Sequence, residues 1–406
     1  MSDHDVIVVG GGPAGVAAAL ALRAEGVGRV AIVDREPVLG GATRHCAHSP
    51  FGMREFGRVY LGAAYGRRLE RDARAAGITV LTGHSVTGLG DDGTLSVAHP
   101  GGVGTLSADR VVLATGAREM PRSARMLPGD RPVGILTTGA LQSYVAFHGL
   151  MPFRRPVILG SELVTLSALL TCLTHGARPV AVLETGPVPL ARAPLRWFPG
   201  VMGVPFRTGV GIVDIIGRDR VEAVRIRRGG QEEVLDCDGL LLTGRFTPEA
   251  ALLWQAGHGV DRGSGGPLID QTGRTANPRY FAAGNLLRPV ETGGWAFREG
   301  RAIGRALAAD LRRAPSAATT VPVAVEGPVK LVVPNIIRRG ERPAAGFDRF
   351  QLRFLRPCKG TLALVIDGRP AHRLSGSWLP ERRVLMPMPT AVCQADSIRF
   401  EFREDR

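Results

Sequence analysis

The stretch at residues 5–15, DVIVVGGGPAG, constrains the fold of this chain more than any other. Its VIVV segment predicts a short buried strand, and the helix predicted to follow runs through VAAALALRA. Between them Gly10, Gly12 and Gly15 have the spacing G-x-G-x-x-G, with Pro13 just inside the helix. The first glycine permits a tight strand-to-helix turn, the second lets the backbone approach a diphosphate, and the third lets the helix pack on the strand. The stretch therefore predicts a dinucleotide-binding turn, although the motif alone also fits a tight turn in another α/β protein.

A second strand is predicted at RVAIVD, which ends at Asp34. Gly10 and Asp34 are 24 residues apart, close to the spacing at which an acidic residue meets a ribose hydroxyl in a dinucleotide fold. The alternative is that Asp34 is a solvent-facing strand end. Gly40 and Gly41 follow, and they mark a second place where the backbone could approach a cofactor.

The same pattern returns at residues 154–184 as strand, turn, helix, strand and acid. Gly160 and Glu184 are again 24 residues apart, so we interpret this segment as an internal repeat of the dinucleotide fold. Its turn has lost two glycines, because Glu162 and Thr165 stand in their places. A side chain at Glu162 blocks close backbone approach, and two like charges about 4 Å apart cost on the order of 4 kcal/mol at a surface-like dielectric. We therefore expect this half to bind nicotinamide dinucleotide weakly or not at all, unless Glu162 turns away along the helix.

The distribution of basic residues argues against nucleic-acid binding. The formal net charge is +14, but only two of the 51 basic residues are lysines, Lys330 and Lys359, and the arginines are spread over the whole length. No basic run is interleaved with aromatic residues, as a single-strand-binding surface requires. Attraction for anionic cofactors or for an acidic partner protein stays open.

The cysteines and the longest apolar run limit which other classes of protein this chain can belong to. Five cysteines, at positions 46, 172, 237, 358 and 393, form no C-x-x-C pair. This predicts a reducing compartment and argues against a disulfide framework, zinc or an iron–sulfur cluster, so no metal site is expected. The apolar run at 157–173 contains Glu162 and several hydroxyl residues, which predicts a strand and a helix rather than a transmembrane segment. Because the first core strand begins at Val6, no room is left for a signal peptide, and we expect a cytoplasmic protein.

Further elements surround the two nucleotide patterns. A helix is predicted at about 63–76, an antiparallel ribbon at 85–108 and a closing strand at RVVLATGA. Strands are also predicted at VGIVDIIG, RVEAVRIRR, GLLLTG and YFAAG, and a long Ala-rich helix begins near Gly294. Beyond Arg313, PSAATTVPVAVEGP predicts a linker, whereas FQLRFL, TLALVI and SIRFEF alternate with period two. The tail is therefore predicted to be a small β domain.

In this order the motifs resemble those of the two-dinucleotide-binding flavoproteins, the pyridine nucleotide–disulfide oxidoreductase superfamily. The motifs are GGGPAG at 10–15, LATGA at 113–117, the degenerate turn at 160–165 and YFAAGN at 280–285, and the resemblance covers about residues 5–313. It implies an α/β fold with two Rossmann-like domains of glutathione-reductase type, one for FAD and one NAD(P)-like, plus a small C-terminal all-β domain. The expected boundaries are 1–118 and 255–316 for the FAD-binding domain, 119–254 for the NAD(P)-like domain and 317–406 for the β domain.

The resemblance also assigns cofactor contacts, position by position. Gly10, Gly12 and Gly15, with Pro13 and Ala14 of the same motif, would hold the FAD diphosphate. Asp34 would take the adenosine ribose, where the family more often has Glu, and Val86 would meet the adenine through its backbone. Thr115 and Gly116 would touch the cofactor from its second side, and Gly284 and Asn285 would meet the ribityl–phosphate segment. The remaining expected cofactor-binding residues are Arg35, Gly41 and Ala114.

Two departures from the family pattern matter. The family usually has Asp at the position of Asn285, so one acceptor is weakened, although a hydrogen bond is still available. The disulfide-reducing members carry a redox cysteine pair, and this chain has none.

The stretches CAHSPFG at 46–52 and RPVETGGW at 288–295 carry a narrower similarity. They are similar to the flavin subunits of heteromeric amine or amino-acid dehydrogenases, which include opine oxidase, hydrogen cyanide synthase and dye-linked proline or hydroxyproline dehydrogenase. This similarity implies an FAD-dependent oxidoreductase that works without a pyridine nucleotide, beside a second protein subunit, on an amine or amino-acid-like substrate. Many such subunits end in a cysteine-rich iron–sulfur domain, whereas the tail here is cysteine-poor, which leaves the electron route open.

In this interpretation Cys46, His48 and Trp295 would line the flavin ring, and they are the candidate catalytic residues. The alternatives are a small buried cysteine at Cys46 and a loop histidine hydrogen-bonded to the backbone at His48. The helix that begins near Trp295 could point its first amides at the negative charge of a reduced flavin. Two other functions stay open. One is a single-chain NAD(P)H-dependent flavin reductase in which Glu162 is accommodated, and the other is a flavin-binding electron-relay or assembly subunit without a substrate of its own.

Overall fold

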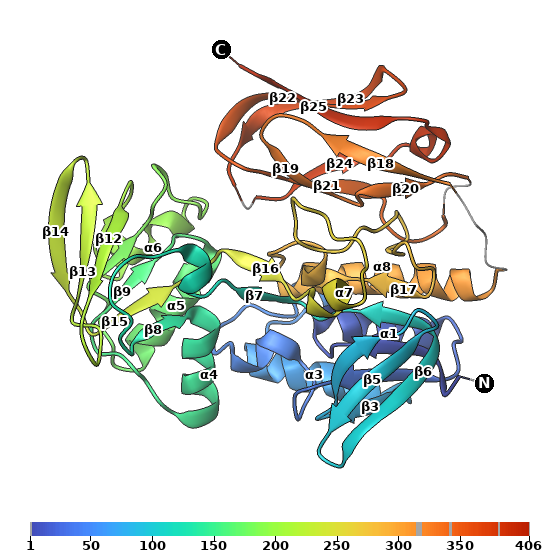
Figure 1. Cartoon of the computed structure of the whole chain (residues 1–406), viewed down its shortest axis with the longest axis horizontal. Coiled ribbons are helices and arrows are strands. Elements are labelled where there is room, and N and C mark those ends of the chain that lie inside the picture. Colours follow the sequence, from blue (N-terminus) through green and yellow to red (C-terminus); the bar gives the residue numbers. More distant parts are fainter. Residues whose placement is uncertain (1, 314–318, 341–342, 381, 406) are drawn as a thin grey trace.

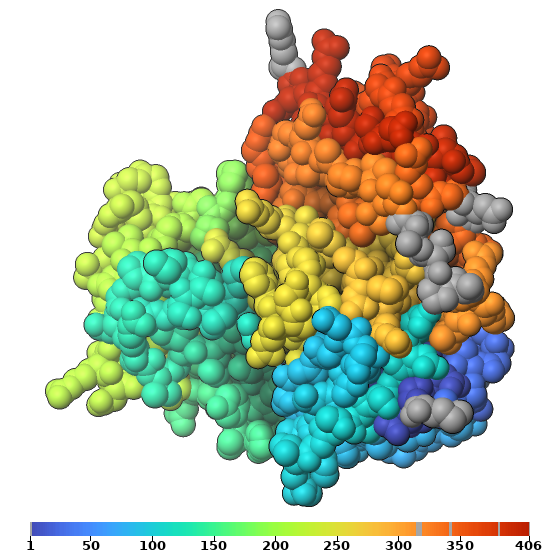
Figure 2. Space-filling model, turned by 45° about the vertical axis from the view of Figure 1, so that its right-hand side comes forward, coloured from blue at the N-terminus to red at the C-terminus, as the bar shows by residue number. Residues whose placement is uncertain are grey.

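A computed structural model describes residues 2–313, 319–340, 343–380 and 382–405 of the chain. Two α/β parts, each built on a parallel sheet, lie side by side, and a part made of strands lies against one of them (Figure 1). This is the fold class that the sequence predicted. The residues drawn in yellow and gold in Figure 2 fill the junction where the parts meet. No helix of the described residues has the length and apolar character needed to cross a bilayer.

The first sheet contains the predicted strands of the first nucleotide pattern. Its strand order is β3-β2-β1-β6-β5-β4, and β17 pairs with β6. The strands are β1 (His4–Val9), β2 (Val30–Asp34), β3 (Thr79–Thr82), β4 (Ser85–Leu89), β5 (Thr94–His99), β6 (Gly102–Leu113) and β17 (Tyr280–Ala282). Strand β6 is long enough to belong to the antiparallel ribbon with its first half and to the parallel sheet, beside β1, with its second half.

This part contains the helices α1 (Pro13–Ala24), α2 (Met53–Phe56), α3 (Gly62–Ala75) and α8 (Gly293–Leu311). Helices α1 and α8 pack closely because glycines of α8 face alanines of α1. A Cβ atom on Gly300 would lie 2.0 Å from the Ala14 carbonyl oxygen, and one on Gly304 would lie 2.5 Å from the Ala18 carbonyl oxygen. This packing fixes the start of α8 beside the start of α1, where the glycine turn lies.

The second sheet repeats the strand–helix–strand unit, as predicted. Its order is β11-β10-β9-β15-β8, and an antiparallel sheet of order β12-β13-β14 accompanies it. The strands are β8 (Ile135–Thr137), β9 (Pro156–Leu159), β10 (Ala181–Leu183), β11 (Phe206–Arg207), β12 (Gly211–Ile216), β13 (Ala223–Arg228), β14 (Gln231–Asp236) and β15 (Gly239–Leu242). The helices are α4 (Thr138–His148), α5 (Leu163–Thr174) and α6 (Phe198–Val201). In both copies the two strands that flank the helix pair in parallel.

Two short strands connect the α/β parts. Strand β7 (Ala117–Glu119) follows the LATGA segment, β16 (Phe246–Pro248) leads back towards α7 (Ala251–Gln255), and the two strands pair antiparallel. Figure 1 shows them side by side in the gap between the two sheets. The chain therefore crosses between the parts twice at one place, close to the carboxyl end of β6.

The C-terminal part consists of two sheets, of order β20-β18-β25-β22-β23 and β19-β21-β24. The strands are β18 (Thr320–Val325), β19 (Val329–Val333), β20 (Ile336–Arg338), β21 (Arg349–Phe354), β22 (Cys358–Ile366), β23 (Arg369–Trp378), β24 (Val384–Pro387) and β25 (Ile398–Glu404). The three strands predicted from the period-two pattern are β21, β22 and β25. The linker prediction is wrong for 320–325, because TVPVAV buries alternate valines in the β core and forms β18; residues 314–318 lie outside the described chain.

Candidate functional site

The first glycine turn has a backbone that only glycine fits. Gly10 adopts a φ of 106°, and a Cβ atom there would lie 2.4 Å from the carbonyl oxygen of Ala114. A Cβ atom on Gly15 would lie 1.9 Å from the carbonyl oxygen of Gly10. These close approaches bring the end of β6 and the start of α1 against the same turn, so the LATGA segment and the glycine motif form one structural unit.

The second glycine of the motif leaves a space open. A Cβ atom on Gly12 would have only one heavy atom within 4 Å, the Cα of Gly41 at 3.9 Å. Gly41 itself has a φ of 55° and faces back towards Gly12. The first-turn amides of α1 have no partner within the helix and can bind an anion. A cradle bordered by two glycines at a helix N-terminus fits a dinucleotide diphosphate, and it is here that FAD would be held.

Asp34 lies inside the turn rather than on the surface, so the alternative of a solvent-facing strand end is wrong. Only 8% of the residue is exposed, and its carboxylate accepts hydrogen bonds from the amides of Gly11 at 2.6 Å and Glu36 at 2.9 Å. Burial raises the pKa of this carboxyl group, while the two amide donors oppose the shift. Arg35 is exposed beside it and lies 3.7 Å from Glu36. A ribose contact of Asp34 stays a prediction.

The residues expected on the second side of the cofactor contact other segments of the chain. The Thr115 hydroxyl donates to the Glu249 carbonyl at 2.8 Å, and Gly116 has a φ of 80° with open space around it. Gly284, with a φ of 77°, lies so close to α1 that a Cβ atom would be 2.6 Å from the Ala14 Cβ. Val86 is half-buried in β4. These positions border the glycine turn or the ribbon, and their cofactor contacts stay predictions.

Asn285 closes a loop with its side chain. Its Oδ1 accepts from the Glu291 amide at 2.7 Å, and its Nδ2 donates to the Glu291 carbonyl at 3.2 Å. An Asp at this position could not donate the second bond, which gives the departure from the family pattern a structural reason. Because the side-chain amide is engaged within the loop, a cofactor contact from residue 285 would fall to its backbone.

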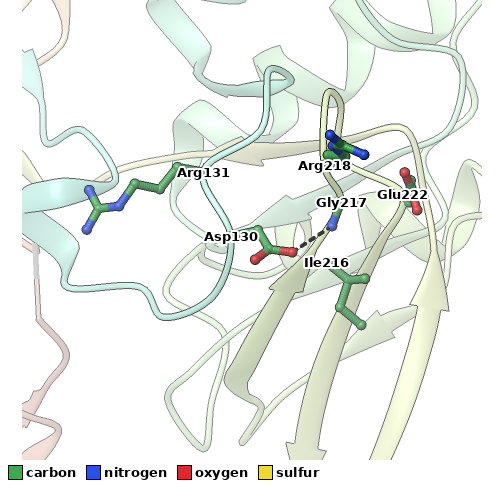
Figure 3. Close-up of a pocket in the computed structure, with 6 residues that line it drawn as sticks. All are labelled: Asp130, Arg131, Ile216, Gly217, Arg218 and Glu222. Carbon is green, nitrogen blue, oxygen red and sulfur yellow. Dashed lines mark hydrogen bonds between the residues drawn. The ribbon is translucent and has the colours of Figure 1, made fainter.

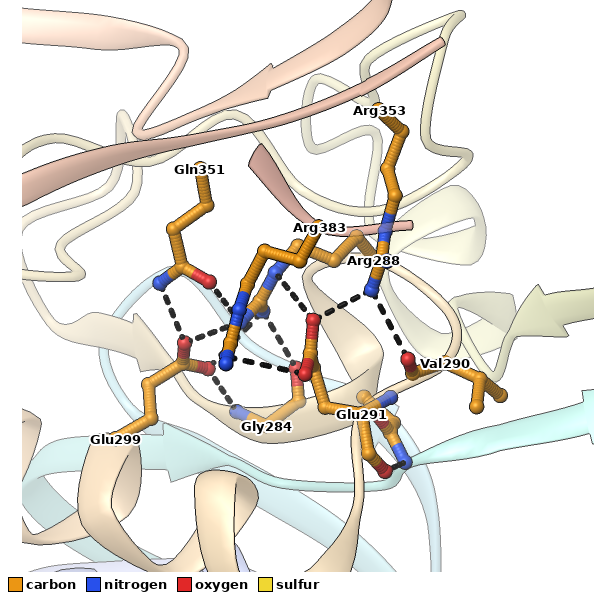
Figure 4. A network of polar contacts seen from close by, with 9 residues as sticks. Gly284, Arg288, Val290, Glu291, Glu299, Gln351, Arg353 and Arg383 are labelled. Atoms are coloured by element: carbon orange, nitrogen blue, oxygen red, sulfur yellow. Dashed lines mark hydrogen bonds and ion pairs between the residues drawn. The ribbon is translucent and has the colours of Figure 1, made fainter. Parts of the chain in front are cut away.

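A buried network of charges fixes the same loop to the C-terminal part (Figure 4). Arg288 is 2% exposed and donates to Glu299 of α8 at 2.6 Å and to Gln351 of β21 at 2.6 Å. Glu299 also accepts from the Gly284 amide at 2.8 Å. Glu291 is bound by Arg353 at 2.5 Å and by Arg383 at 3.1 Å, both from the C-terminal part. Side chains of the C-terminal part therefore fix the YFAAGN–RPVETGGW loop in place.

The three predicted catalytic residues contact different neighbours. The Cys46 thiol donates to the Ala42 carbonyl at 3.3 Å and approaches Gln142 of α4 at 3.8 Å. The His48 ring lies 5.2 Å from the ring of Phe51, and Phe51 in turn packs beside Gly293 at the start of α8. Trp295 is surrounded by guanidinium groups, with Arg383 3.7 Å, Arg54 5.0 Å and Arg298 5.6 Å from its ring centre. His48 thus contacts Phe51 beside the start of α8, whereas Trp295 contacts arginines.

The Cys46 thiol is half-buried and has the chemistry of an unreactive cysteine. Burial raises the pKa of its thiol to about 12, and no disulfide joins the cysteines that the structure describes. We expect Cys46 of the folded protein to react with iodoacetamide at pH 8 roughly 1,000-fold more slowly than an unperturbed thiol, because only the thiolate attacks. Mass spectrometry of timed samples measures the rate, and urea-unfolded protein is the control. Fast labelling of Cys46 in the native state would show a reactive thiol.

Sequence reasoning missed a polar cluster between the two α/β parts. Glu119 of β7 accepts from the Gly139 amide at the start of α4 at 2.7 Å, and burial raises the pKa of its carboxyl group. Burial also lowers the pKa of His45 to about 4. Gln142 is 4% exposed and donates to Ser167 of α5 at 2.5 Å. The only sequence signal was the position of Glu119 three residues after the LATG segment, because the other members are distant in sequence.

The second turn differs from the first in what lies over it. Glu162 does not turn away along α5: its Oε1 lies 2.0 Å from the position of a Cβ atom on Gly244, and its Oε2 lies 2.7 Å from that on Gly160. The same Oε2 accepts from the Thr243 hydroxyl at 3.3 Å. The side chain therefore fills the space that is open in the first turn.

A shallow hollow on the second α/β part is unrelated to either turn (Figure 3). It is lined by Asp130, Arg131, Ile216, Gly217, Arg218 and Glu222. Asp130 accepts from the Gly217 amide at 3.1 Å, and Arg131 points away from the other labelled side chains. None of the predicted site residues lines this hollow, so we assign it no chemistry.

Comparison with known proteins gives consistent results. A family model described as pyridine nucleotide-disulphide oxidoreductase matches residues 4–306. The chain is 30% identical over 316 residues to the ferredoxin reductase component of chlorobenzene dioxygenase from Cupriavidus sp. (strain PS12), which covers 74% of this chain and 69% of that protein. It is 27% identical over 316 residues to an opine oxidase subunit from Agrobacterium tumefaciens (strain Ach5), which covers 70% of this chain and 61% of that protein.

Among solved structures, the thioredoxin reductase of T. acidophilum superposes with a TM-score of 0.64 at 20% identity. The match covers 77% of this chain and all of that one. At this identity the likeness shows the fold alone, with its two α/β parts.

Proposed function

The chain belongs to the pyridine nucleotide-disulphide oxidoreductase family, and from this premise we propose that it is an FAD-dependent flavin subunit of a heteromeric amine or amino-acid dehydrogenase or oxidase of opine or proline type. The family establishes an oxidoreductase with a flavin cofactor. The open cradle between Gly12 and Gly41 is the observation that favours FAD, a dinucleotide, as this flavin. When bound, FAD supplies the redox chemistry, and the protein binds and orients it.

The residues of this chain divide that task. The glycine turn and the first amides of α1 would hold the diphosphate, and Asp34 would face the adenosine ribose. The start of α8 would present its first amides beside Phe51, because Gly293 lies next to both Phe51 and Pro13. The sequence has no C-x-x-C pair, and no disulfide joins the described cysteines. Electrons would therefore enter or leave through the flavin edge rather than through a thiol pair.

A partner subunit is supported by the names of the relatives and by charge. Both relatives are parts of multicomponent systems, a component of a dioxygenase and a subunit of an oxidase. The opine oxidase match spans 61% of that subunit, so its whole activity is a proposal for this chain. The net charge of +14 favours association with an acidic protein partner.

A second candidate is a single-chain NAD(P)H-dependent flavoprotein reductase. It is favoured by the 30% identity to a ferredoxin reductase component and by the complete strand–helix–strand unit β9-α5-β10. An electron-relay subunit without its own substrate is a third outcome, which the same experiment separates.

Anaerobic mixing of the flavin-loaded protein with NADH or NADPH is expected to leave the flavin absorbance near 450 nm unchanged. Reduction is expected when an amine or amino-acid substrate is added to the flavin-loaded protein, with or without the partner subunit. Stopped-flow absorbance measures both rates. Rapid bleaching by either nucleotide would favour the single-chain reductase. Reduction that needs the partner, even when substrate is saturating, would favour the relay.

A further inference from the structure

The second nucleotide fold contains an acidic group where the first has empty space. The two copies have the same turn geometry: Gly160 has a φ of 128°, comparable with 106° at Gly10. In the first copy the position after the turn is Gly12, which leaves the space open, whereas in the second copy it is Glu162. The Glu162 carboxylate does not extend into solvent but folds back over Gly160 and Gly244. A negatively charged group thus lies at the N-terminus of α5, as a bound phosphate would.

The segment after β10 contacts the second turn in the same way as the segment after β2 contacts the first. The Ala191 amide donates to the Ser161 carbonyl at 2.9 Å, and the Leu190 amide donates to the Ser161 hydroxyl oxygen at 3.0 Å. That hydroxyl donates in turn to Glu184 at the end of β10. Glu184 has the same spacing from its turn as Asp34, and its carboxylate binds Ser161 and the Gly186 amide at 2.7 Å. The first fold has the same arrangement, because the Gly40 amide donates to the Gly11 carbonyl at 2.8 Å and Asp34 accepts from the amides of Gly11 and Glu36. The difference between the two turns is therefore the Glu162 side chain.

The cavity beside the second turn is small. The cavity beside the turn, lined by Glu162, Thr165, Pro189, Ala191 and Arg196 among others, has a volume of about 10 Å³, which holds about one water molecule. Arg125, which is 8% exposed, donates hydrogen bonds from its guanidinium group to the carbonyls of Thr243 and Gly244, at 2.9 and 2.7 Å. This buried cation is thus held by backbone carbonyls beside the turn.

We propose that Glu162 is a built-in occupant of the phosphate position in the second dinucleotide fold, and that it makes this chain reject NAD(H) and NADP(H). The Glu162 side chain acts in two ways, because its bulk fills the approach to the backbone and its charge repels a diphosphate. The inference deepens the proposed function, in which no pyridine nucleotide takes part. It concerns binding at the second fold, so it stands or falls separately from the flavin substrate.

The test is a titration of the flavin-loaded protein with NAD⁺, in which isothermal calorimetry measures the affinity. We expect the wild type to bind at least roughly 100-fold more weakly than the variant Ser161→Gly/Glu162→Gly, which places glycine at the positions that match Gly11 and Gly12 and removes both bulk and charge. Glu162→Gly alone is expected to fall between the two. The matched control Glu222→Gly, which removes the same charge from the surface hollow of the same part, should bind as the wild type does.

A pH series separates charge from bulk. Burial raises the pKa of Glu162 to about 7, Glu184 adds to the shift, and Thr243 and Arg125 oppose it. Acidification from pH 8 to pH 6 therefore neutralises the Glu162 carboxylate, and we expect NAD⁺, whose diphosphate keeps its charge over this range, to bind the wild type several-fold more tightly at pH 6. Glu162→Gln should lose this pH dependence.

Two results would overturn the proposal. One is wild-type binding of NAD⁺ as tight as that of the double variant. The other is a double variant that keeps its flavin and its circular dichroism spectrum and yet gains no affinity. Failure of the proposed function would look different, since it would show as absent turnover of any amine or amino acid while the nucleotide titrations still behaved as stated.

Discussion

Replacing Gly12 by glutamate is expected to yield folded protein without bound FAD. Among the described residues other than its two chain neighbours, the only heavy atom within 4 Å of a Cβ atom on Gly12 is the Gly41 Cα at 3.9 Å, so the backbone accepts a Cβ atom here. The side chain would occupy the cradle in the way that Glu162 occupies the second turn. A carboxylate about 4 Å from a diphosphate charge costs on the order of 4 kcal/mol, which corresponds to roughly 1,000-fold in affinity. The ratio of flavin to protein after purification, from the absorbance at 450 and 280 nm, measures the loss.

The matched control for this experiment is Gly104→Glu. Gly104 is an exposed glycine of β6 with no heavy atom within 4 Å of a Cβ position, so it receives the same residue in open space away from the turn. It should keep a full complement of flavin. Gly12→Glu protein that retains stoichiometric FAD would show that the cofactor lies elsewhere, and the assignment of the first turn would then be wrong.

The sequence predicted the architecture because its signals were local. The GGGPAG and LATGA motifs, the buried VIVV and RVAIVD runs and the period-two tail each depend on neighbouring residues, and the corresponding strands β1, β2, β6 and β21 are where these patterns placed them. The glycine turn was equally predictable, since backbone geometry and spacing require glycine at Gly10 and Gly15. The error at β18 arose from the same reasoning, because proline and alanine in TTVPVAV resemble a linker when the partner strand β25 is unknown.

The side-chain details of the site could not be predicted, because they depend on contacts between distant segments. The position of Glu162 over the turn needs Gly244, and the raised pKa of Cys46 needs the packing of α4 against the loop. Asn285 illustrates the point: its spacing suggested a cofactor contact, but the Glu291 backbone six residues later takes its side chain. The role of the tail could not be predicted either. Gln351, Arg353 and Arg383 are distant in sequence from the YFAAGN–RPVETGGW loop, and the fold brings them into contact with it.

The charge network between the tail and the loop leads to a second large expected effect. Glu299 is 9% exposed, holds Arg288 at 2.6 Å and accepts from the Gly284 amide at 2.8 Å. Glu299→Gln keeps the size of the side chain but removes one of the two acids of the network drawn in Figure 4. Glu291 is then the one drawn acid that faces Arg288, Arg353 and Arg383. Breaking a buried ion pair by removing one partner costs about 3–5 kcal/mol. We therefore expect a loss of that size in urea unfolding followed by circular dichroism, and a weaker hold on FAD because the Gly284 amide loses a charged acceptor.

The control for this variant is Arg227→Ala, which breaks a pair with Glu232 whose side chains are 58% and 40% exposed. Exposed pairs contribute about 0–1 kcal/mol, so this change should be nearly silent. A second variant, Arg288→Met/Glu299→Met, removes both charges and fills their volume, and it should be less destabilised than Glu299→Gln because no unpaired charge stays buried between them. If Glu299→Gln unfolded within about 1 kcal/mol of the wild type, the network would not fix the loop. The tail would then be attached to the flavin-binding part by its apolar contacts, in which Leu331 and Val333 join the core of the first sheet.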